Sequence, residues 1–303
     1  MMIETVVEGL RFPEGPIVLS SGDVLVVEIE RQTLTRVSPD GRTTVVAELG
    51  GGPNGAAVGP DGKVYICNNG GFTWSDIDGL LIPGHQPDDY RSGSIQRVDI
   101  ETGEVETLYD SCDGEKLEGP NDIVFDAHGG FWFTDHGKSH HGGRTWGAIL
   151  YARADGSAIT RVRSEQIGPN GIGLSPDGRI VYFSDTYTQR LWAIDLEGPG
   201  VAAPPPAPWL PGRLIATLPN FQLLDSLKVE ADGRVCVGTL VHGGVTIFSL
   251  DGTTEHVPFP DIAITNLAFG GADMRDTWLT ASSTGRLYKM RWPRPGLPLE
   301  FNL

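Results

Sequence analysis

The chain has 303 residues, of which 39% are apolar and 20% charged, a composition typical of a soluble globular protein. Its formal net charge of −16 argues against a nucleic-acid partner, and no stretch is apolar over the roughly 18 residues that a membrane helix needs. The first residues lack the basic start and apolar core of a signal peptide. The three cysteines, Cys67, Cys112 and Cys236, are odd in number and far apart. We therefore expect reduced cysteines and a cytoplasmic protein without membrane or nucleic-acid partners; the oligomeric state stays open.

A repeated pattern runs along the whole chain. Each copy has a polar residue, a short apolar strand, a glycine-containing turn such as GPDGK or SPDGR, and a second apolar strand. A third strand follows each pair, and a fourth follows most of them. The copies begin at Pro13, Pro53, Pro120 and Pro169, and two weaker copies begin at Asp225 and Asn266.

Six units of four antiparallel strands, spaced by roughly 40 to 67 residues, predict an all-β fold, the six-bladed β-propeller. The last unit ends at RLYKMRW without a clear fourth strand, whereas ETVVEGL near the start has no unit of its own. We therefore expect the N-terminal strand to complete the last blade and close the ring. Residues 1–303 would then form a single domain. A WD40 propeller is disfavoured because no Gly-His and Trp-Asp signature recurs.

One polar residue opens the first strand of every unit. These ring residues are Glu14, Asn54, Asn121, Asn170, Asp225 and Asn266. Since first strands line the channel of a propeller, we expect all six at one channel mouth. A Pro-Asn-Gly turn would explain single members of the set, but Glu14 is a poor turn former and Asp225 heads an apolar strand.

Two carboxylates in a narrow channel repel each other unless a cation lies between them. The ring therefore predicts one bound divalent metal ion. Oxygen ligands favour Ca²⁺, and Mg²⁺, Mn²⁺ or Zn²⁺ stay possible. The negative net charge is consistent with solubility alone, or with a field that collects a cation.

Two long insertions lie between the second and third strands of their blades, on the same face as the ring. They span residues 70–92 and 136–146, and we interpret them as lids over the channel mouth. The substrate-binding residues expected on this face are Asn54, Asn69, Trp74, His136, Trp146 and Asp185. His136 either contacts substrate or moves a proton, or is a loop histidine bonded to its neighbours. Asp185 either orients Asn170 or forms a wall of the site.

Two other motifs receive no catalytic role. His140 and His141 lack a third histidine or a cysteine at a suitable spacing, so a second metal is not expected. The proline-rich run 201–212 lies between strands three and four of its blade, which places it on the opposite face.

The motifs RFPEGP, the repeated PN[GD], GFWFTD and YFSDT resemble the gluconolactonase, regucalcin and senescence-marker-protein family of six-bladed propellers, over nearly the whole chain. The resemblance implies that Glu14, Asn170 and Asp225 hold the metal, and that Asn121 contacts the metal or the substrate. The regucalcin branch has an arginine two residues before the asparagine of blade three. Here that residue is Gly119, so substrate recognition must differ from that branch.

The resemblance also implies a hydrolase that opens a sugar-acid lactone or a similar small lactone or ester. The metal would act as a Lewis acid and activate water. Asp225 is the expected general base or water-positioning group, and Asn121 would orient the substrate. Two alternatives stay open: an organophosphate-type ester hydrolase, and a non-enzymatic propeller that binds calcium or a protein partner.

Overall fold

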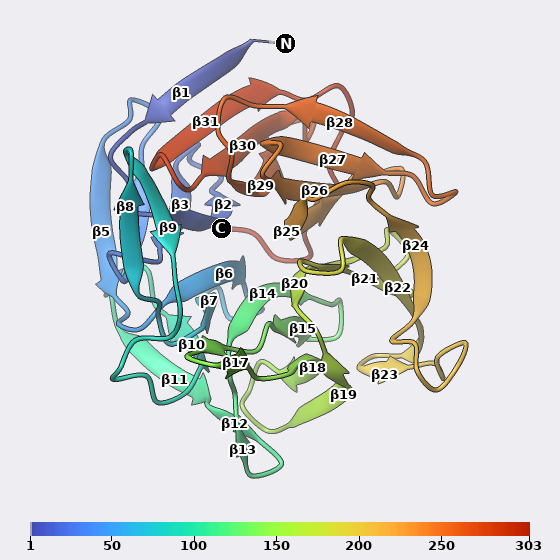
Figure 1. Cartoon of the computed structure of the whole chain (residues 1–303). Helices are drawn as coiled ribbons and strands as arrows, with labels where there is room; N and C mark the ends of the chain where they lie inside the picture. Colours follow the sequence, from blue (N-terminus) through green and yellow to red (C-terminus); the bar gives the residue numbers. More distant parts are fainter. Residues whose placement is uncertain (1) are drawn as a thin grey trace.

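The computed structural model describes residues 2–303, which form strands and loops arranged in six sheets around a central channel (Figure 1). Every sheet is antiparallel and has four strands, and one carries a short fifth strand. The predicted six-bladed propeller is confirmed. None of the residues between 2 and 303 belongs to a helix long and apolar enough to cross a membrane.

The blades follow one another along the chain, each with its first strand at the channel. Blades one and two contain β2 (Pro13–Val18), β3 (Val24–Glu28), β4 (Thr33–Val37) and β5 (Thr43–Glu48), then β6 (Pro53–Val58), β7 (Val64–Asn68), β10 (Ser94–Val98) and β11 (Val105–Tyr109). Blades three and four contain β14 (Pro120–Phe125), β15 (Gly130–Asp135), β18 (Gly147–Arg153) and β19 (Ile159–Gln166), then β20 (Pro169–Leu174), β21 (Ile180–Asp185), β22 (Arg190–Gly198), β23 (Val201–Ala202) and β24 (Arg213–Thr217). Blades five and six contain β25 (Leu223–Val229), β26 (Val235–Leu240), β27 (Gly244–Phe248) and β28 (Thr254–Pro258), then β29 (Ile264–Gly270), β30 (Asp276–Ala281), β31 (Arg286–Arg291) and β1 (Ile3–Val7). Three small hairpins lie outside the blades: β8 (Trp74–Ile77) with β9 (Leu80–Pro83), β12 (Ser111–Cys112) with β13 (Glu115–Lys116), and β16 (Ser139–His140) with β17 (Gly143–Arg144).

The ring closes through β1, which pairs with β31 as predicted (Figure 1). Ile3 lies opposite Met290 and Val7 lies opposite Leu287. The first and last segments of the chain thus share one sheet, so blade six cannot be completed without the N-terminal strand.

The core is divided among the interfaces between blades. One cluster joins Tyr65 and Ile95 of blade two to Phe131 and Leu150 of blade three. Because each sheet packs against a neighbour on both faces, a strand such as β15 is buried along its whole length. This explains why the second strands are continuous apolar runs and do not alternate.

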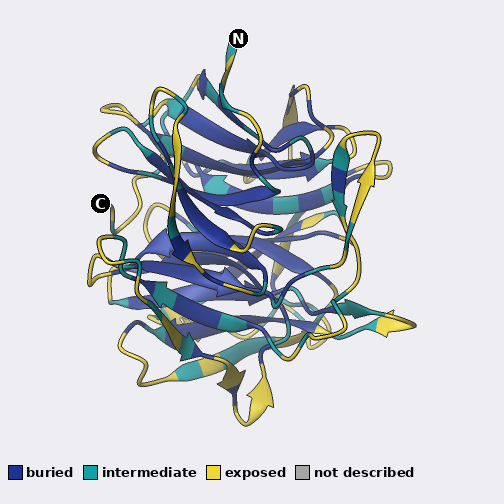
Figure 2. Ribbon diagram, turned by 90° about the vertical axis from the view of Figure 1, so that its left-hand side faces the viewer, coloured by how far each residue is buried: buried dark blue, intermediate teal, exposed yellow. Residues whose placement is uncertain are grey.

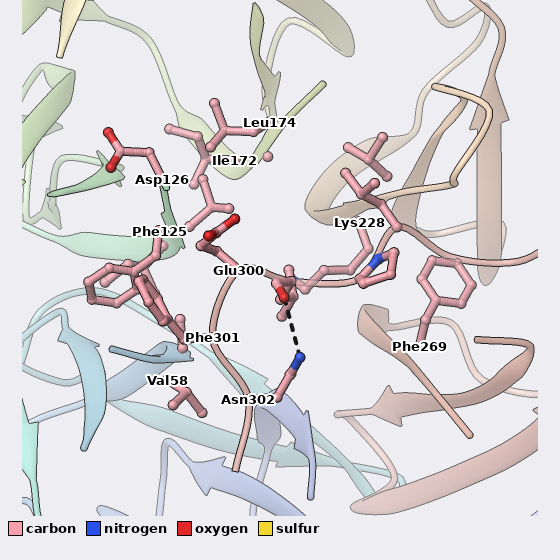
Figure 3. A pocket seen from close by; sticks show the side chains of 18 of the residues that line it. Val58, Phe125, Asp126, Ile172, Leu174, Lys228, Phe269, Glu300, Phe301 and Asn302 are labelled. Atoms are coloured by element: carbon pink, nitrogen blue, oxygen red, sulfur yellow. Dashed lines mark hydrogen bonds between the residues drawn. The ribbon is translucent and has the colours of Figure 1, made fainter. Parts of the chain in front are cut away.

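The C-terminal segment closes the channel end opposite the lids. In Figure 2 the C-terminus lies on one side of the disc and the projecting hairpins lie on the other. The backbone N–H of Leu297 donates to Val229, and that of Ser20 donates to the carbonyl of Leu303. A cavity of 320 Å³ lies between this segment and the ends of the inner strands, where Phe301 packs on Phe125 at 5.7 Å between ring centroids (Figure 3).

Neighbouring inner strands approach each other most closely where glycine follows a ring residue. A Cβ atom on Gly55 would lie 2.4 Å from the carbonyl oxygen of Asn121. One on Gly171 would lie 2.4 Å from the backbone nitrogen of Leu227. The glycine of the PNG motif therefore serves close packing inside the channel wall, since β6 and β20 run straight through the motif.

Gly55→Ala should lower the free energy of unfolding by about 1 to 3 kcal/mol, because the added methyl group overlaps the backbone of blade three. Gly198→Ala is the matched control, since a Cβ there meets open space, and it should change stability by less than about 0.5 kcal/mol. Denaturant unfolding of both variants checks this. Equal stability of the two variants would contradict the packing argument.

Candidate metal centre and active site

A β-bulge lies at or beside the ring residue in every inner strand. The register with the second strand shifts across Glu14/Ile17, Pro53/Ala56, Pro120/Ile123, Pro169/Ile172, Leu224/Leu227 and Ile264/Asn266. A bulge leaves a residue unpaired and redirects its side chain. The repeated bulge thus treats the ring residue, or the residue beside it, alike in all six blades.

Hydroxyl groups on the second strands hold these bulges in place. Thr134 accepts a hydrogen bond from the backbone N–H of Asp122 and donates to the carbonyl of Asn170 in the next blade. Ser184 likewise accepts from Gly171 at 2.8 Å and donates to the carbonyl of Asp225 at 2.6 Å. Each hydroxyl thus satisfies the backbone of two blades at once and fixes the spacing between neighbouring ring residues.

Three ring oxygens are buried without a hydrogen-bond partner in the part of the chain that the structure describes: Glu14 Oε1, Asn121 Oδ1 and Asn170 Oδ1. The second polar atom of the side chain is occupied in Glu14 and in Asn170. Glu14 Oε2 accepts from the backbone N–H of Gly15 at 2.6 Å and from Asn266 Nδ2 at 2.7 Å. Asn170 Nδ2 donates to Thr186 Oγ1 at 3.1 Å.

Burial of an unsatisfied oxygen costs about 1 to 3 kcal/mol, and here three such oxygens occur in one ring. A hard divalent cation satisfies carboxylate and carboxamide oxygens together. Across residues 2–303, no cluster of three or more histidine, cysteine, aspartate or glutamate side chains could hold a metal. A metal at the ring would therefore need Asn121 and Asn170 as ligands beside the two carboxylates.

Both ring carboxyl groups have a raised pKa. Burial is the main cause that raises the pKa of Asp225 well above its ordinary value, and repulsion from Glu14 is the second. Burial also raises the pKa of Glu14, to about 7, against the opposing hydrogen bonds from Asn266 and Gly15. Repulsion from Glu14 in blade one thus acts on Asp225 in blade five, although the two residues are far apart in the sequence.

A second group of charged side chains lies next to the ring, one to three residues further along the inner strands, and was not predicted from the sequence. Lys228 Nζ lies 3.7 Å from Asp122 Oδ2 and 3.3 Å from Asn266 Oδ1. Together with Glu14 and Asp225, these side chains give three carboxylates and one ammonium group. When all are ionised they carry an excess of two negative charges, which one divalent ion would neutralise.

A sequence signal for these side chains did exist. Asp122 occupies the position where three other repeats have glycine, and Lys228 is the one charge at its repeat position. The equivalent residues in the other repeats are Ile17, Ala57, Val124, Gly173 and Phe269. A charge in an otherwise apolar channel strand is the pattern that would have pointed to it.

Two of the predicted site residues have structural partners. Asn69 accepts hydrogen bonds from Lys138 and from the backbone N–H of Gly71, which fixes the start of the first insertion. Asp185 accepts from the backbone N–H of Thr188 at 3.0 Å, whereas the side chain that bonds Asn170 is Thr186. Asn54, the third of these predicted residues, is buried, and its role in substrate binding stays a prediction.

The two insertions are anchored to the body of the propeller. In the first, Trp74 packs on Phe12 at 5.1 Å between ring centroids, and the N–H of Leu81 donates to the carbonyl of Ser283. The buried Lys138 joins the two insertions, because its ammonium group donates to the carbonyls of Asn69 and Gly71. Trp146 in the second insertion is 64% exposed, so it does not contribute to a closed wall.

His136 is adjacent to the ring and stays neutral. Its Nδ1 lies 3.1 Å from the carbonyl oxygen of Pro169, directly before Asn170. Since a carbonyl only accepts, Nδ1 carries the proton and Nε2 is left as an acceptor. Burial, and then the positive charge of Arg144, lower the pKa of His136 to about 3. The prediction that a near-neutral pKa lets His136 move a proton is therefore disfavoured, and a role as hydrogen-bond acceptor is favoured.

Comparison with known proteins agrees with this fold. Residues 12–283 match the model of the SMP-30/Gluconolactonase/LRE-like region, and the chain belongs to this family of propeller proteins. The chain is 23% identical over 283 residues to a gluconolactonase of Zymomonas mobilis, covering 82% of this chain and 70% of that protein. It is 25% identical over 251 residues to lactonase drp35 of Staphylococcus epidermidis, covering 81% of this chain and 66% of that protein.

Among solved structures, the calcium-binding protein regucalcin from Agrobacterium tumefaciens superposes with a TM-score of 0.71 at 20% identity, over 97% of each chain. At that identity the match supports the fold. The family points to lactone hydrolysis as the class of activity. The three cysteines are free and buried, as expected.

Without metal, the protein should lose stability as the pH rises. The folded pKa of Glu14 exceeds its ordinary value of 4.5, so its protonation stabilises the fold below about pH 4.5, and this contribution is lost as the pH rises through about 7. Melting temperatures in chelator at about pH 5 and about pH 8 should therefore differ, and Glu14→Gln should reduce the difference. Glu101→Gln, at an exposed position, is the control and should leave it unchanged. A difference that survives in Glu14→Gln would contradict the assignment.

Proposed function

We propose that this protein is a metal-dependent lactonase, in which the channel ring holds one divalent ion, most simply Ca²⁺, and opens the ring of a sugar-acid lactone or a similar small ester. The observation that carries the proposal is the set of three buried, unpartnered oxygens beside Asp225. Family membership supports the reaction class. The whole chain would act as one propeller domain.

The residues Glu14, Asn121, Asn170 and Asp225 would hold the ion, which when bound would polarise the lactone carbonyl and acidify water. Asn266 and Gly15 orient Glu14 so that Oε1 is left for the ion. Thr186 does the same for Asn170, by holding Nδ2 and leaving Oδ1. The site would therefore be organised before the ion arrives, which lowers the cost of binding.

Asp225 is the best candidate for the group that takes a proton from the attacking water. Asp225 as a residue is partly exposed, whereas Glu14 is buried and already accepts two hydrogen bonds on one oxygen. Asp225 Oδ1 accepts from the backbone N–H of Ser226 at 3.1 Å. Asn121 would contact the substrate carbonyl, because its Oδ1 faces the ring while its amide group can donate.

Substrate would enter from the face that carries the two insertions. The opposite end of the channel is covered by residues 297–303, whose backbone is tied to Val229 and Ser20. The charged pair of Asp122 and Lys228 separates the ring from that end. Substrate specificity would therefore depend on the insertions.

Removal of metal should abolish lactone opening. A chelator should reduce turnover of simple γ- and δ-lactones to the uncatalysed rate, and added Ca²⁺ or Mn²⁺ should restore it, as followed by acid release in a pH-stat. Failure to open any lactone with any divalent ion would contradict the proposal and favour a non-enzymatic calcium- or partner-binding propeller.

Asp225→Asn should lower kcat/KM for a lactone by on the order of 10²- to 10⁴-fold, since an amide cannot accept the proton. Asp251→Asn, in an exposed turn of the same blade, is the control and should keep full activity. Melting temperature shows whether each variant folds. Wild-type activity in folded Asp225→Asn would remove this residue from the mechanism.

A further inference from the structure

A cluster of three side chains lies beside Asn170 on the face that carries the insertions, and we call it the Arg144 cluster: Arg144, His136 and Tyr187. Arg144 donates to the carbonyl oxygen of His136, and its guanidinium group lies 4.4 Å from the ring centroid of Tyr187. The rings of His136 and Tyr187 are 5.5 Å apart. Arg144 and His136 belong to the second insertion, and Tyr187 is the second residue after β21.

Two contacts tie the Arg144 cluster to the ring. His136 bonds the carbonyl of Pro169, and Tyr187 directly follows Thr186, the residue that holds the amide of Asn170. A Cβ atom on Gly168 would lie 2.5 Å from the ring of Tyr187 and 3.3 Å from that of His136. Both rings therefore flank the chain that leads into Asn170, so a group bound by the cluster lies next to a substrate at the ring.

Arg144 has no acidic partner. The ion pairs formed within residues 2–303 do not include it, although the whole chain carries a net charge of −16. Its hydrogen bonds go to two backbone carbonyls, those of His136 and Thr145, and they use Nη2 and Nε. Nη1 is therefore available to a ligand. A guanidinium group in this state is suited to bind a carboxylate.

The other members of the cluster add complementary groups. Within the described chain, the Tyr187 hydroxyl and the Nε2 atom of His136 have no hydrogen-bond partner, and Tyr187 is 46% exposed. A phenolic hydroxyl donates to a carboxylate, whereas neutral Nε2 accepts from a hydroxyl. The positive charges of Arg144 and Lys138 both act on His136, so the local potential favours an anion.

We propose that the Arg144 cluster is a specificity subsite for a carboxylate that the substrate carries in addition to its lactone ring. A neighbouring hydroxyl group of the substrate would donate a hydrogen bond to His136. This inference rests on the proposed lactonase function and narrows it to lactones of hydroxylated dicarboxylic acids. A neutral lactone would leave Arg144 without a counter-charge.

The test compares the γ-lactones of gluconic acid and of glucaric acid, which share the ring and differ in a terminal hydroxymethyl or carboxylate group. The wild-type protein should open the carboxylate-bearing lactone with a kcat/KM at least about tenfold higher. Arg144→Gln should remove this preference, mainly by raising KM for the carboxylate-bearing lactone. The kcat/KM for the neutral lactone should stay within about twofold of the wild-type value. Arg144→Lys should retain part of the preference, because lysine keeps the positive charge but lacks the planar guanidinium group that can donate two parallel hydrogen bonds.

Arg91→Gln is the matched control, because it removes one exposed positive charge from the first insertion and should keep the preference. Calorimetric binding of the open products, glucarate and gluconate, to the metal-loaded protein tests the subsite without turnover. Tighter binding of glucarate that depends on Arg144 supports the subsite even if neither lactone is opened, and in that case only the lactonase proposal fails. Equal binding of the two products, or a preference that Arg144→Gln keeps, overturns the subsite.

Discussion

The repulsion between Glu14 and Asp225 is the constraint on which the rest of the site depends. Two carboxylates held in a buried channel are stable only if protons or a cation compensate them. The bulges and the second-strand hydroxyls prevent the strands from moving apart to relieve the repulsion. The propeller wall therefore maintains an unfavourable arrangement of charge, and ligand binding can release this cost.

The two ends of the channel differ in a way that suits a one-sided site. At one end the ring residues lie beneath anchored insertions, joined to each other by Lys138. At the other end the C-terminal segment covers a cavity with both apolar and charged lining residues (Figure 3). The pair of Asp122 and Lys228 lies between these regions and balances part of the ring charge. The proposed active site and the C-terminal segment thus lie on opposite faces of the propeller.

Family membership indicates the fold and the class of reaction, whereas substrate recognition depends on individual residues. The family accounts for the propeller and for lactone hydrolysis as the class of activity. Gly119 stands where the regucalcin branch has an arginine, and its backbone is packed against Gly137, so no side chain fits there. The guanidinium group of Arg144, which forms no ion pair within residues 2–303, comes instead from the second insertion, and we propose that it takes part in recognition.

The sequence alone determined the blade count, the closure by the N-terminal strand and the six ring positions, because each is a local pattern repeated at a regular interval. It placed Thr186 and Arg144 on the face of the ring, but it did not reveal Lys228, nor the contacts that Thr186 and Arg144 make. Their roles arise from contacts between blades: Lys228 with Asp122, Thr186 with Asn170, and Arg144 with Tyr187. A repeat shows which residues are equivalent, but only the closed ring decides which of them meet, since charge, burial and orientation at the hub depend on segments far apart in the chain.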